Sequence, residues 1–540
     1  MGDGPGRWRG TAAGYPGLVA ADRVPEPMAS EYHRATRHDR SSGGATWRRV
    51  DLSRRPPAFK RYPGTEPIAL PRELPAGEAS AATVLSRGGH GPGPRLDLRA
   101  VARLLFFSAG VTRRVAGIAM RAAPSAGALY PIELYLVSGE IEGLEPGVYH
   151  FDPLAFALHR LRAGDQRGHL AAATAPELAS TPASLLLTGI PWRTVWRYGA
   201  RGYRHLLWDA GTVLANLIAL ADGAGLPCHV LTAFCDAALA ALLGLDRPGD
   251  LEEYPLAVVS LGAPAARAAA PLGPVSPLEA SPEPVTGRPP VDPLVAAVHR
   301  SGDLDRFEEV ERWRERARTL ASFSATVHVT RPATALPLPL EEVILRRGST
   351  RRFAPVEIPA EGLTWVLAAA TRPVPGDFVA PGRTLLEHHL AVHAVVGLAP
   401  GSYRWSAEGP VLLRPGDLRE AATRACLEQE AGGESAYTAF HGRRLETLLE
   451  ALGGRGYRAA QLEAGIVAGR LLLAAHALGL GGTCLTFYDD EVERLFATRA
   501  ATMLATACGL PLRPPRPGRR PPGRSPGIDP EGAPAVAPDR

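Results

Sequence analysis

The cysteines and histidines of this sequence lack the spacings that would indicate metal or disulfide chemistry. The cysteines are odd in number and form no CxxC pair; they are Cys228, Cys235, Cys426, Cys484 and Cys508. The histidines show no HxxxH or comparable ligand spacing. We therefore expect free thiols in a reducing compartment, hence a cytoplasmic protein without a metal site.

The octapeptide PSAGALYP, residues 124–131, combines small side chains with turn-forming ones. Pro124, Ser125, Ala126 and Gly127 carry no charge and lead straight into the strand-like run IELYLV. Such a turn contributes little to a hydrophobic core. Its small residues suit close approach of the backbone to a ligand.

Composition sets limits on the function class. With 540 residues the chain is long enough for two or more domains, and a hydrophobic fraction of 45% with 21% charged residues is ordinary for a globular protein. A net charge of +5 is small for this length and does not predict nucleic-acid binding. Lys60 is the only lysine, so the arginine excess indicates compositional bias. No apolar run predicts a membrane span, and the N-terminus lacks a signal-peptide core.

Three segments rich in Pro, Gly, Ala or Arg divide the chain. Residues 1–28 and 514–540 are predicted to be disordered tails, and residues 264–292 an Ala/Pro linker. Two blocks remain, residues 29–263 and 293–513.

The two blocks share a register, which predicts a tandem duplication. RGYRHLLWDAG begins at Arg201, and RGYRAAQLEAG begins at Arg455, 254 positions later. The offset holds without a gap through CHVLTAFCD and TCLTFYDD, and it also pairs Glu133 with Glu387 and Tyr149 with Tyr403. Because both blocks keep the RGYR stretch, we expect its arginines and tyrosine to be structural and to fix the start of a long helix.

Each block predicts helices and a modest mixed sheet, an α+β class. Helices are expected near 97–109 and 361–371, and a long helix at about 204–224 with its counterpart ending at Gly479. IELYLVSG and the following GVYHFDPLAFALHRL predict a strand and hairpin partner, and ASLLLTGI a buried strand present in the first block only. DLDRFEEVERWRERARTLA predicts a solvated helix with ion pairs.

The ordered set of motifs resembles the nitroreductase-like flavoprotein superfamily. The segments that carry the resemblance are RRGSTRRF, EAG and ALGLGGTCLTFYDD. The first block resembles SagB-type peptide dehydrogenases through YHRATRH, LLFFSAGVTRR, PSAGALYPIELYLV and RYGARGYRHLLWDAG. That resemblance implies FMN as cofactor and oxidation of thiazolines and oxazolines to azoles in a modified peptide. It also implies that the two blocks form an intrachain pseudo-dimer with FMN between them.

The resemblance implies one composite FMN site built from both blocks. The second block supplies a phosphate strip, whose two guanidiniums and hydroxyl suit a dianionic phosphate, and a glycine-rich strand start that lets backbone N–H groups approach a flavin edge. The first block supplies the PSAG turn. The residues implied are Arg347, Ser349 and Arg351 for the strip, Gly479, Leu480, Gly481, Gly482 and Thr483 for the strand start, and Pro124, Ser125, Ala126 and Gly127 for the turn. The alternative is that Arg347 and Arg351 are merely exposed arginines at a helix start.

All three parts of the reciprocal site are degraded. Where the strip belongs, LSRGGHGPG keeps Arg87 but has Gly89 and Gly91 in place of serine and the second arginine. The strand start has Pro227 for a glycine, and the turn reads FVAP at 378–381. We therefore predict one FMN per chain.

A candidate catalytic pair stands before the RGYR stretch of the first block. The SagB-type family has Lys-Tyr there, whereas this chain has Arg197-Tyr198. Arginine stays protonated and cannot act as the base. We expect Tyr198 to accept or donate the proton, with Arg197 lowering its pKa. The alternative is a surface pair without a catalytic role.

Three functions remain open at this stage. The first is an FMN-dependent dehydrogenase acting on a heterocyclised peptide, with a possible cyclodehydratase partner. The second is a nitroreductase-like enzyme that passes hydride from NAD(P)H to a small acceptor. The third is a non-catalytic scaffold subunit of a peptide-modifying complex, which the Arg197 departure would suit.

Overall fold

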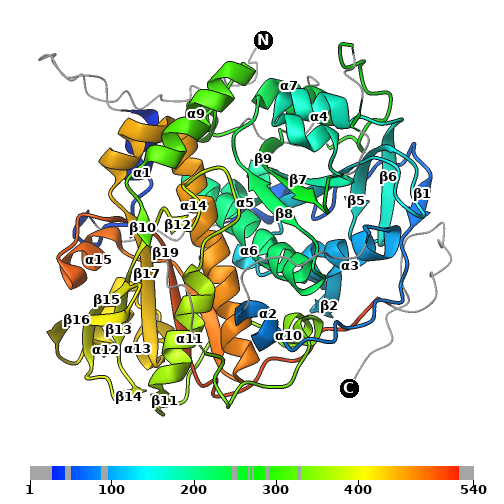
Figure 1. Cartoon of the computed structure of the whole chain (residues 1–540). Coiled ribbons are helices and arrows are strands. Elements are labelled where there is room, and N and C mark those ends of the chain that lie inside the picture. Colours follow the sequence, from blue (N-terminus) through cyan, green and yellow to red (C-terminus); the bar gives the residue numbers. More distant parts are fainter. Residues whose placement is uncertain are drawn as a thin grey trace, which may run out of the picture.

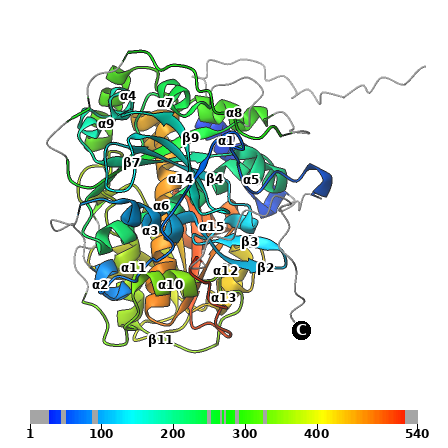
Figure 2. The same ribbon diagram turned by 90° about the vertical axis from the view of Figure 1, so that its right-hand side faces the viewer.

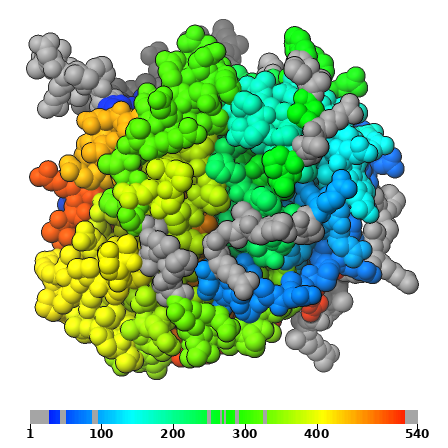
Figure 3. All heavy atoms as spheres, viewed as in Figure 1, coloured from blue at the N-terminus to red at the C-terminus, as the bar shows by residue number. Residues whose placement is uncertain are grey.

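The computed structural model describes residues 27–42, 50–86, 95–245, 252–264, 268–269, 273–285, 291–324 and 330–521. The chain folds into two α+β domains on either side of two long central helices, α6 (Gly202–Gly223) and α14 (Leu445–Ala477) (Figure 1). The face shown in Figure 3 divides in the same way, with the second domain's yellow residues at the left and the first domain's blue and cyan residues at the right.

The first domain is built on a seven-stranded antiparallel sheet. Its strand order is β1-β6-β5-β4-β7-β9-β8. The predicted strand and hairpin partner are confirmed as β4, β5 and β6, and the apolar run YPLAVVSL forms β9. The strands are β1 (Pro67–Ala69), β4 (Ile132–Ser138), β5 (Gly147–Asp152), β6 (Ala157–Ala163), β7 (Ala183–Gly189), β8 (Cys228–Leu231) and β9 (Tyr254–Leu261).

The second domain repeats this architecture with six antiparallel strands. Its order is β16-β15-β13-β17-β19-β18. The prediction that ASLLLTGI has no counterpart is wrong, because β17 lies 254 positions after β7. Its sequence YTAFHGR contains His441 and Arg443 and so did not read as an apolar strand, yet every residue in it is buried. The strands are β13 (Glu387–Val392), β15 (Gly401–Ser406), β16 (Gly409–Pro415), β17 (Tyr437–Arg443), β18 (Gly481–Leu485) and β19 (Ala501–Gly509).

Short strand pairs and peripheral helices complete the two domains. The pairs are β2 (Val111–Val115) with β3 (Ile118–Arg121), β10 (Phe323–Ser324) with β12 (Arg383–Thr384), and β11 (Ile358–Pro359) with β14 (Val395–Val396). The other helices of the first domain are α1 (Met28–Ala35), α2 (Ala81–Ser86), α3 (Leu98–Ala109), α4 (Arg167–Ala173), α5 (Pro191–Tyr198) and α7 (Asp236–Leu243). Those of the second are α8 (Pro293–Arg300), α9 (Phe307–Thr319), α10 (Leu340–Arg346), α11 (Ala360–Thr371), α12 (Arg419–Ala425), α13 (Ala431–Glu434) and α15 (Asp489–Phe496).

The predicted duplication extends to backbone conformation, which confirms the tandem pair of domains. Gly199 and Gly453 lie 254 positions apart and share nearly the same left-handed φ, 58° and 60°. Gly225 and Gly479, which follow the two long helices, also have positive φ values of 68° and 73°. Each of these positions needs a residue that tolerates positive φ, which explains why glycine stands in both copies.

The domains meet where α6 crosses α14, and two glycines make that crossing possible. A Cβ added to Gly211 would stand 2.6 Å from the Cα of Gly465, and a Cβ on Gly465 would stand 2.9 Å from the Cα of Gly211. Beside them the Trp208 indole donates to the Gln461 side chain (2.6 Å). One continuous hydrophobic core therefore runs through both domains.

We expect Gly465→Leu to lower the free energy of unfolding by about 3 kcal/mol or more, because a side chain there would force two backbones apart. Urea unfolding followed by circular dichroism measures the loss. Gly64→Ala is the matched control, since no atom lies within 4 Å of the position of its added Cβ. Equal midpoints for the two variants would contradict the close crossing.

Paired ion clusters join the domains at the starts of the long helices. Arg201 and Arg204 of the first domain face Asp489 of the second, at 3.4 and 3.5 Å. Reciprocally, Arg455 and Arg458 contact Asp236 of the first domain. The expectation that the RGYR stretch fixes a helix start agrees with α6, which begins at Gly202, whereas Arg455 lies inside α14, just after the non-helical residue Gly453.

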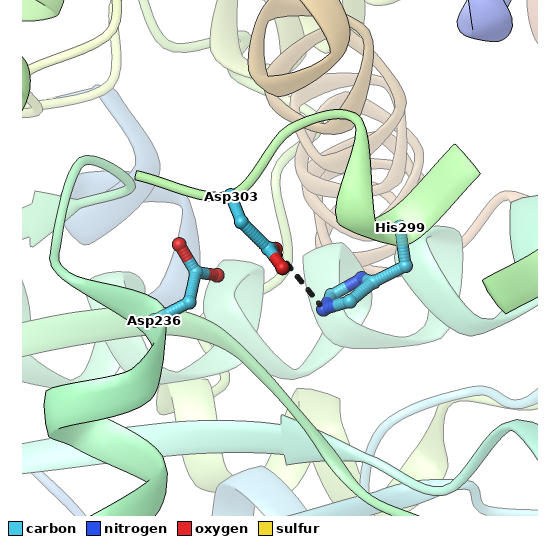
Figure 4. A group of neighbouring side chains, drawn as sticks. All are labelled: Asp236, His299 and Asp303. Atoms are coloured by element: carbon cyan, nitrogen blue, oxygen red, sulfur yellow. Dashed lines mark ion pairs between the residues drawn. The ribbon is translucent and has the colours of Figure 1, made fainter. Parts of the chain in front are cut away.

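Asp236 also belongs to a convergent group with His299 and Asp303 (Figure 4). Arg458 donates to Asp236 (3.0 Å) and to Asp303 (2.6 Å), and Arg455 donates to Asp236 as well. Burial lowers the pKa of His299 well below its usual value, so this histidine is neutral. Because two guanidiniums already balance the two carboxylates, the group is an interdomain ion-pair cluster.

The predicted disorder of the C-terminal tail is wrong for residues 514–521. Backbone hydrogen bonds hold this segment: Gly518 N–H donates to the Leu345 carbonyl, and Arg519 N–H donates to the Thr112 carbonyl (2.7 Å). The segment thus hydrogen-bonds to both α10 and β2, and Figure 2 shows these two elements on one side of the molecule. A Pro/Arg-rich composition indicates that a segment forms no hydrophobic core of its own, but it does not show whether the segment packs against the rest of the protein.

Two further expectations from the sequence were that no segment spans a membrane and that the cysteines form no disulfides. The stretch Pro191–Gly223 is long and apolar enough to cross a membrane by length and composition, but 89% of its most apolar window is buried inside the protein. None of the five cysteines, all of which lie in the described part of the chain, forms a disulfide.

Candidate active site between the domains

The predicted phosphate strip runs beside the glycine-rich strand start. Helix α10 ends at Arg346, and the chain then extends along β18. Thr350 N–H donates to the Gly482 carbonyl (3.0 Å), and Ser349 forms an isolated parallel β-bridge with Gly482. Ser349 and Arg351 are exposed. The strip and the strand start therefore form one surface of the second domain.

Arg347 connects this surface to the first domain. It follows the end of a helix and is only 6% exposed, so the alternative of an exposed helix-start arginine fails for this residue. One terminal nitrogen donates to the Ala122 carbonyl (2.9 Å), just before the PSAG turn. Burial lowers the pKa of Arg347 to about 10, and its Nε is buried without a hydrogen-bond partner. From the first domain, the guanidinium of Arg113 donates to the Arg347 carbonyl (2.7 Å).

The glycines of the strand start also fit their neighbours closely. A Cβ on Gly481 would collide with the Thr350 side chain, and one on Gly482 would lie 2.8 Å from Leu472. Gly479 and Leu480 form the turn from α14 into β18, and Thr483 is buried within the strand. Packing against protein atoms therefore accounts for the small residues at 481 and 482, in addition to the ligand approach predicted from the sequence.

The PSAG turn is fixed by side chains of α6. The Pro124 carbonyl accepts a hydrogen bond from Thr212 (2.8 Å), and the Asp209 carboxylate accepts from the Ser125 hydroxyl and from Ala126 N–H (3.0 Å). Gly127 has a left-handed φ of 62°. The turn adjoins a small hollow that is lined by Pro124, Ser125, Tyr130 and Asp209 among others.

Tyr198 lies against this turn. Its hydroxyl oxygen stands 2.8 Å from where a Cβ on Gly127 would be, and its ring stacks on His205 with centroids 4.0 Å apart. The exposed Arg197 lies beside it, with its guanidinium carbon 5.8 Å from the Tyr198 ring centroid. Arg351 of the second domain also acts on the phenol electrostatically. The pair predicted from the sequence and the strip of the other domain thus share one neighbourhood.

The predicted direction of the Tyr198 pKa shift is wrong. Burial raises the pKa of Tyr198; Arg197 and Arg351 lower it and Asp209 raises it, but the net shift is upward. A sequence shows the adjacent cation but does not show how much water the fold removes. Tyr198 is therefore a neutral phenol near pH 7.

Asp209 is a site residue that the sequence reasoning missed. It is buried beneath the turn, and burial raises its pKa to about 7 against the opposing hydrogen bonds from Ser125 and Ala126. The repeat could have indicated it, because Asp209 lies 254 positions before another acidic residue, Glu463. Burial raises the pKa of Glu463 to about 7 as well. Glu463 likewise accepts a backbone hydrogen bond, from Leu385 N–H (2.9 Å).

The reciprocal site is closed by direct contact between the domains. Val230 N–H donates to the Pro375 carbonyl (2.8 Å), and Asp377 N–H donates to the Val230 carbonyl (3.2 Å). The Asp377 carboxylate accepts from the backbone N–H groups of Thr232 and Ala233 and from Arg314. Arg314 belongs to α9, so the prediction of a solvated helix is wrong for this buried face. Arg87, Gly89 and Gly91 lie outside the described residues.

The sequence profile of the nitroreductase family matches residues 101–263 and again residues 344–515. The chain belongs to the nitroreductase family. This family comprises flavoprotein oxidoreductases, and the double match agrees with the duplicated α+β fold. Both the predicted superfamily and the intrachain pairing of two such domains are therefore confirmed.

Individual relatives agree with this assignment. MJ1384 of Methanocaldococcus jannaschii, a nitroreductase by name, is 32% identical over 170 residues, which cover 31% of this chain and 81% of the relative. The microcin B17-processing protein McbC of Escherichia coli is 29% identical over 160 residues, 28% of this chain and 58% of McbC. A crystal structure named as a nitroreductase of Anabaena variabilis superposes with a TM-score of 0.69 at 26% identity, covering 90% of this chain and all of its own.

Proposed function

We propose that this nitroreductase-family protein is an FMN-dependent dehydrogenase of SagB type, which oxidises azolines to azoles in a ribosomally made peptide. The observation that carries the proposal is the neighbourhood of Tyr198, which gathers the turn of one domain and Arg351 of the other. The similarity to McbC, whose name describes the processing of microcin B17, supports a peptide as substrate. A cyclodehydratase that makes the azolines is the partner we expect.

The residues present fit FMN at this place. Arg347 is a buried cation whose Nε has no hydrogen-bond partner, and Thr350 Oγ1 is buried and likewise unpartnered. Both features suit a bound anion such as the FMN phosphate, with Ser349 and Arg351 exposed on the same strip. When bound, FMN would supply a two-electron acceptor that takes a hydride from the substrate.

The side chains of this site would bind and orient the substrate. The neutral Tyr198 phenol would donate a hydrogen bond, and its stacking on His205 holds the ring in place. A guanidinium is not a general base, so we assign Arg197 electrostatic support and no proton transfer. This assignment accommodates arginine where the SagB-type family has lysine.

The deciding experiment is incubation of the purified protein with a thiazoline-bearing peptide, followed by mass spectrometry. Oxidation removes two hydrogens, so we expect a loss of about 2 Da per ring. Protein that leaves the peptide unchanged yet oxidises NAD(P)H in the presence of a nitroaromatic compound would support the reductase alternative. Colourless protein that does not take up added FMN would support the scaffold alternative.

We further expect one FMN per chain. Val230 forms backbone hydrogen bonds with Pro375 and Asp377 of the other domain where the reciprocal site would lie, which supports a single cofactor. Flavin released by heat and measured by absorbance, divided by protein from amino-acid analysis, gives the ratio. A ratio near two would show that the reciprocal site binds FMN despite those contacts.

A further inference from the structure

Three buried carboxylates between the domains, Asp236, Asp377 and Asp489, are paired with arginines, whereas Asp209 has no cation beside it. Asp236 and Asp489 are each neutralised by two arginines, and Asp377 pairs with Arg314. Within the described part of the chain, no arginine, lysine or histidine nitrogen lies within 4 Å of the Asp209 carboxylate. Its partners are the Ser125 hydroxyl and Ala126 N–H. Asp209 is therefore bonded to the PSAG turn, through the Ser125 hydroxyl, and not to an arginine of the other domain.

The groups around Asp209 are three neutral ones and, farther off, one cation. Tyr130 beside the turn, Tyr198 on α5 and Cys484 on β18 are neutral, because burial raises the pKa of each. Arg121 lines the same hollow as Asp209 but lies beyond ion-pair distance of its carboxylate. Ser125 in turn accepts a hydrogen bond from Tyr130 N–H (2.8 Å), which fixes its oxygen. Such surroundings hold an acid close to half-protonated near neutral pH, since burial has raised the pKa of Asp209 to about 7.

Ser125 connects Asp209 to the space in front of the turn. Ser125 is half-buried and, together with Asp209, lines the small hollow beside the turn. Its hydroxyl is therefore the atom through which a proton can pass from that space to the buried carboxylate.

We propose that Asp209 is the proton-holding residue of the active site and that it acts through the Ser125 hydroxyl. The inference rests on the proposed function. As the substrate carbon gives up its proton to Ser125 Oγ, the proton already on Ser125 moves to Asp209 Oδ2. This transfer moves no electrons; the electron pair of the oxidation leaves the substrate as hydride, taken up by the flavin. The transfer leaves Ser125 as a neutral hydroxyl, and Asp209 regains its ionised state when it releases the proton to solvent through Ser125.

Glu463 provides a matched control for this role. It occupies the equivalent position in the second domain, is buried, and also has a pKa raised to about 7 by burial. It holds the backbone at Leu385, away from the PSAG turn. Asp209→Asn and Glu463→Gln each remove one titrating carboxyl while keeping an oxygen that can accept the backbone hydrogen bond.

Infrared titration of the protein, stripped of cofactor and without substrate, tests the charge state directly. In wild-type protein we expect the carbonyl band of a protonated carboxylic acid to disappear as pH rises through about 7. Asp209→Asn should lose one component of this change, and Glu463→Gln should lose another. An Asp209 signal that stays ionised from about pH 5 to pH 9 would overturn the inference whatever the substrate.

Kinetics with the thiazoline peptide test the function of the proton. Because only ionised Asp209 can accept a proton, wild-type kcat/KM should rise with pH through about 7, and Glu463→Gln should keep that rise. Asp209→Asn should lose the rise and lower kcat by about 10² to 10⁴-fold with FMN retained. Ser125→Ala should lower kcat similarly while leaving the Asp209 infrared change intact. A wild-type pH profile and rate in Asp209→Asn would overturn the relay and leave the proposed function standing, whereas an unreactive wild-type protein would overturn the proposed function itself.

Discussion

Replacing Arg347 and Arg351 together with alanine is expected to yield folded protein that purifies without flavin. Arg347 is a buried guanidinium with an unpartnered Nε, and Arg351 is exposed on the same strip near Tyr198. Charge-assisted hydrogen bonds of this kind contribute about 1.5–3 kcal/mol each. Losing both should weaken FMN binding by about 10² to 10⁴-fold. Fluorescence titration of the cofactor-free variant with FMN measures the Kd.

Arg346→Ala is the matched control for this double variant. Arg346 is the exposed last residue of α10 and directly precedes the strip, so its removal costs a similar charge without touching the proposed phosphate contacts. Thermal unfolding guards against a trivial loss of fold, because Arg347 also bonds the Ala122 carbonyl. A double variant with the wild-type Kd for FMN would remove the strip from the cofactor site.

Much of the fold followed from one numerical regularity in the sequence. A constant offset of 254 positions places α14 on the span of α5 and α6 and places β15 and β17 on β5 and β7. Because two copies of one domain bury related faces, the repeat also predicted pairing within the chain. The offset does not hold at either end of the repeat: α11 begins 262 positions after α3, and β19 begins 247 positions after β9, because the connecting segments differ in length.

The sequence motifs predicted which segments come together at the candidate site, but they did not predict the pKa shifts of its side chains. The sequence shows Tyr198 next to Arg197, yet the upward shift of its pKa comes from burial by segments far away in the chain. The closure of the reciprocal site by Asp377 depends on contacts between residues about 145 positions apart. In the sequence Asp209 is an ordinary helix residue, and only the structure shows that its carboxylate accepts a hydrogen bond from Ser125 of the turn.

Tyr198→Phe is expected to retain FMN and to lower turnover of the thiazoline peptide by about 10²-fold. Phenylalanine keeps the ring that stacks on His205 at 4.0 Å and removes only the hydroxyl beside Gly127. The cofactor contacts proposed for Arg347 and Ser349 lie in the other domain and should be unaffected. The visible absorption spectrum reports flavin retention, and the rate of azole formation reports the catalytic loss.

Tyr403→Phe separates a catalytic hydroxyl from a merely structural one. The Tyr403 hydroxyl donates to the Ala399 carbonyl (2.7 Å) in the second domain's sheet, so this variant loses a hydrogen bond of known geometry away from the site. We expect this variant to lower the free energy of unfolding by about 1 kcal/mol and to leave the turnover rate unchanged. The opposite pattern, full turnover in Tyr198→Phe, would leave Tyr198 as a packing partner of the PSAG turn. In that case Asp209 and Ser125 would handle the proton without help from a phenol, since a guanidinium such as that of Arg197 is not a general base.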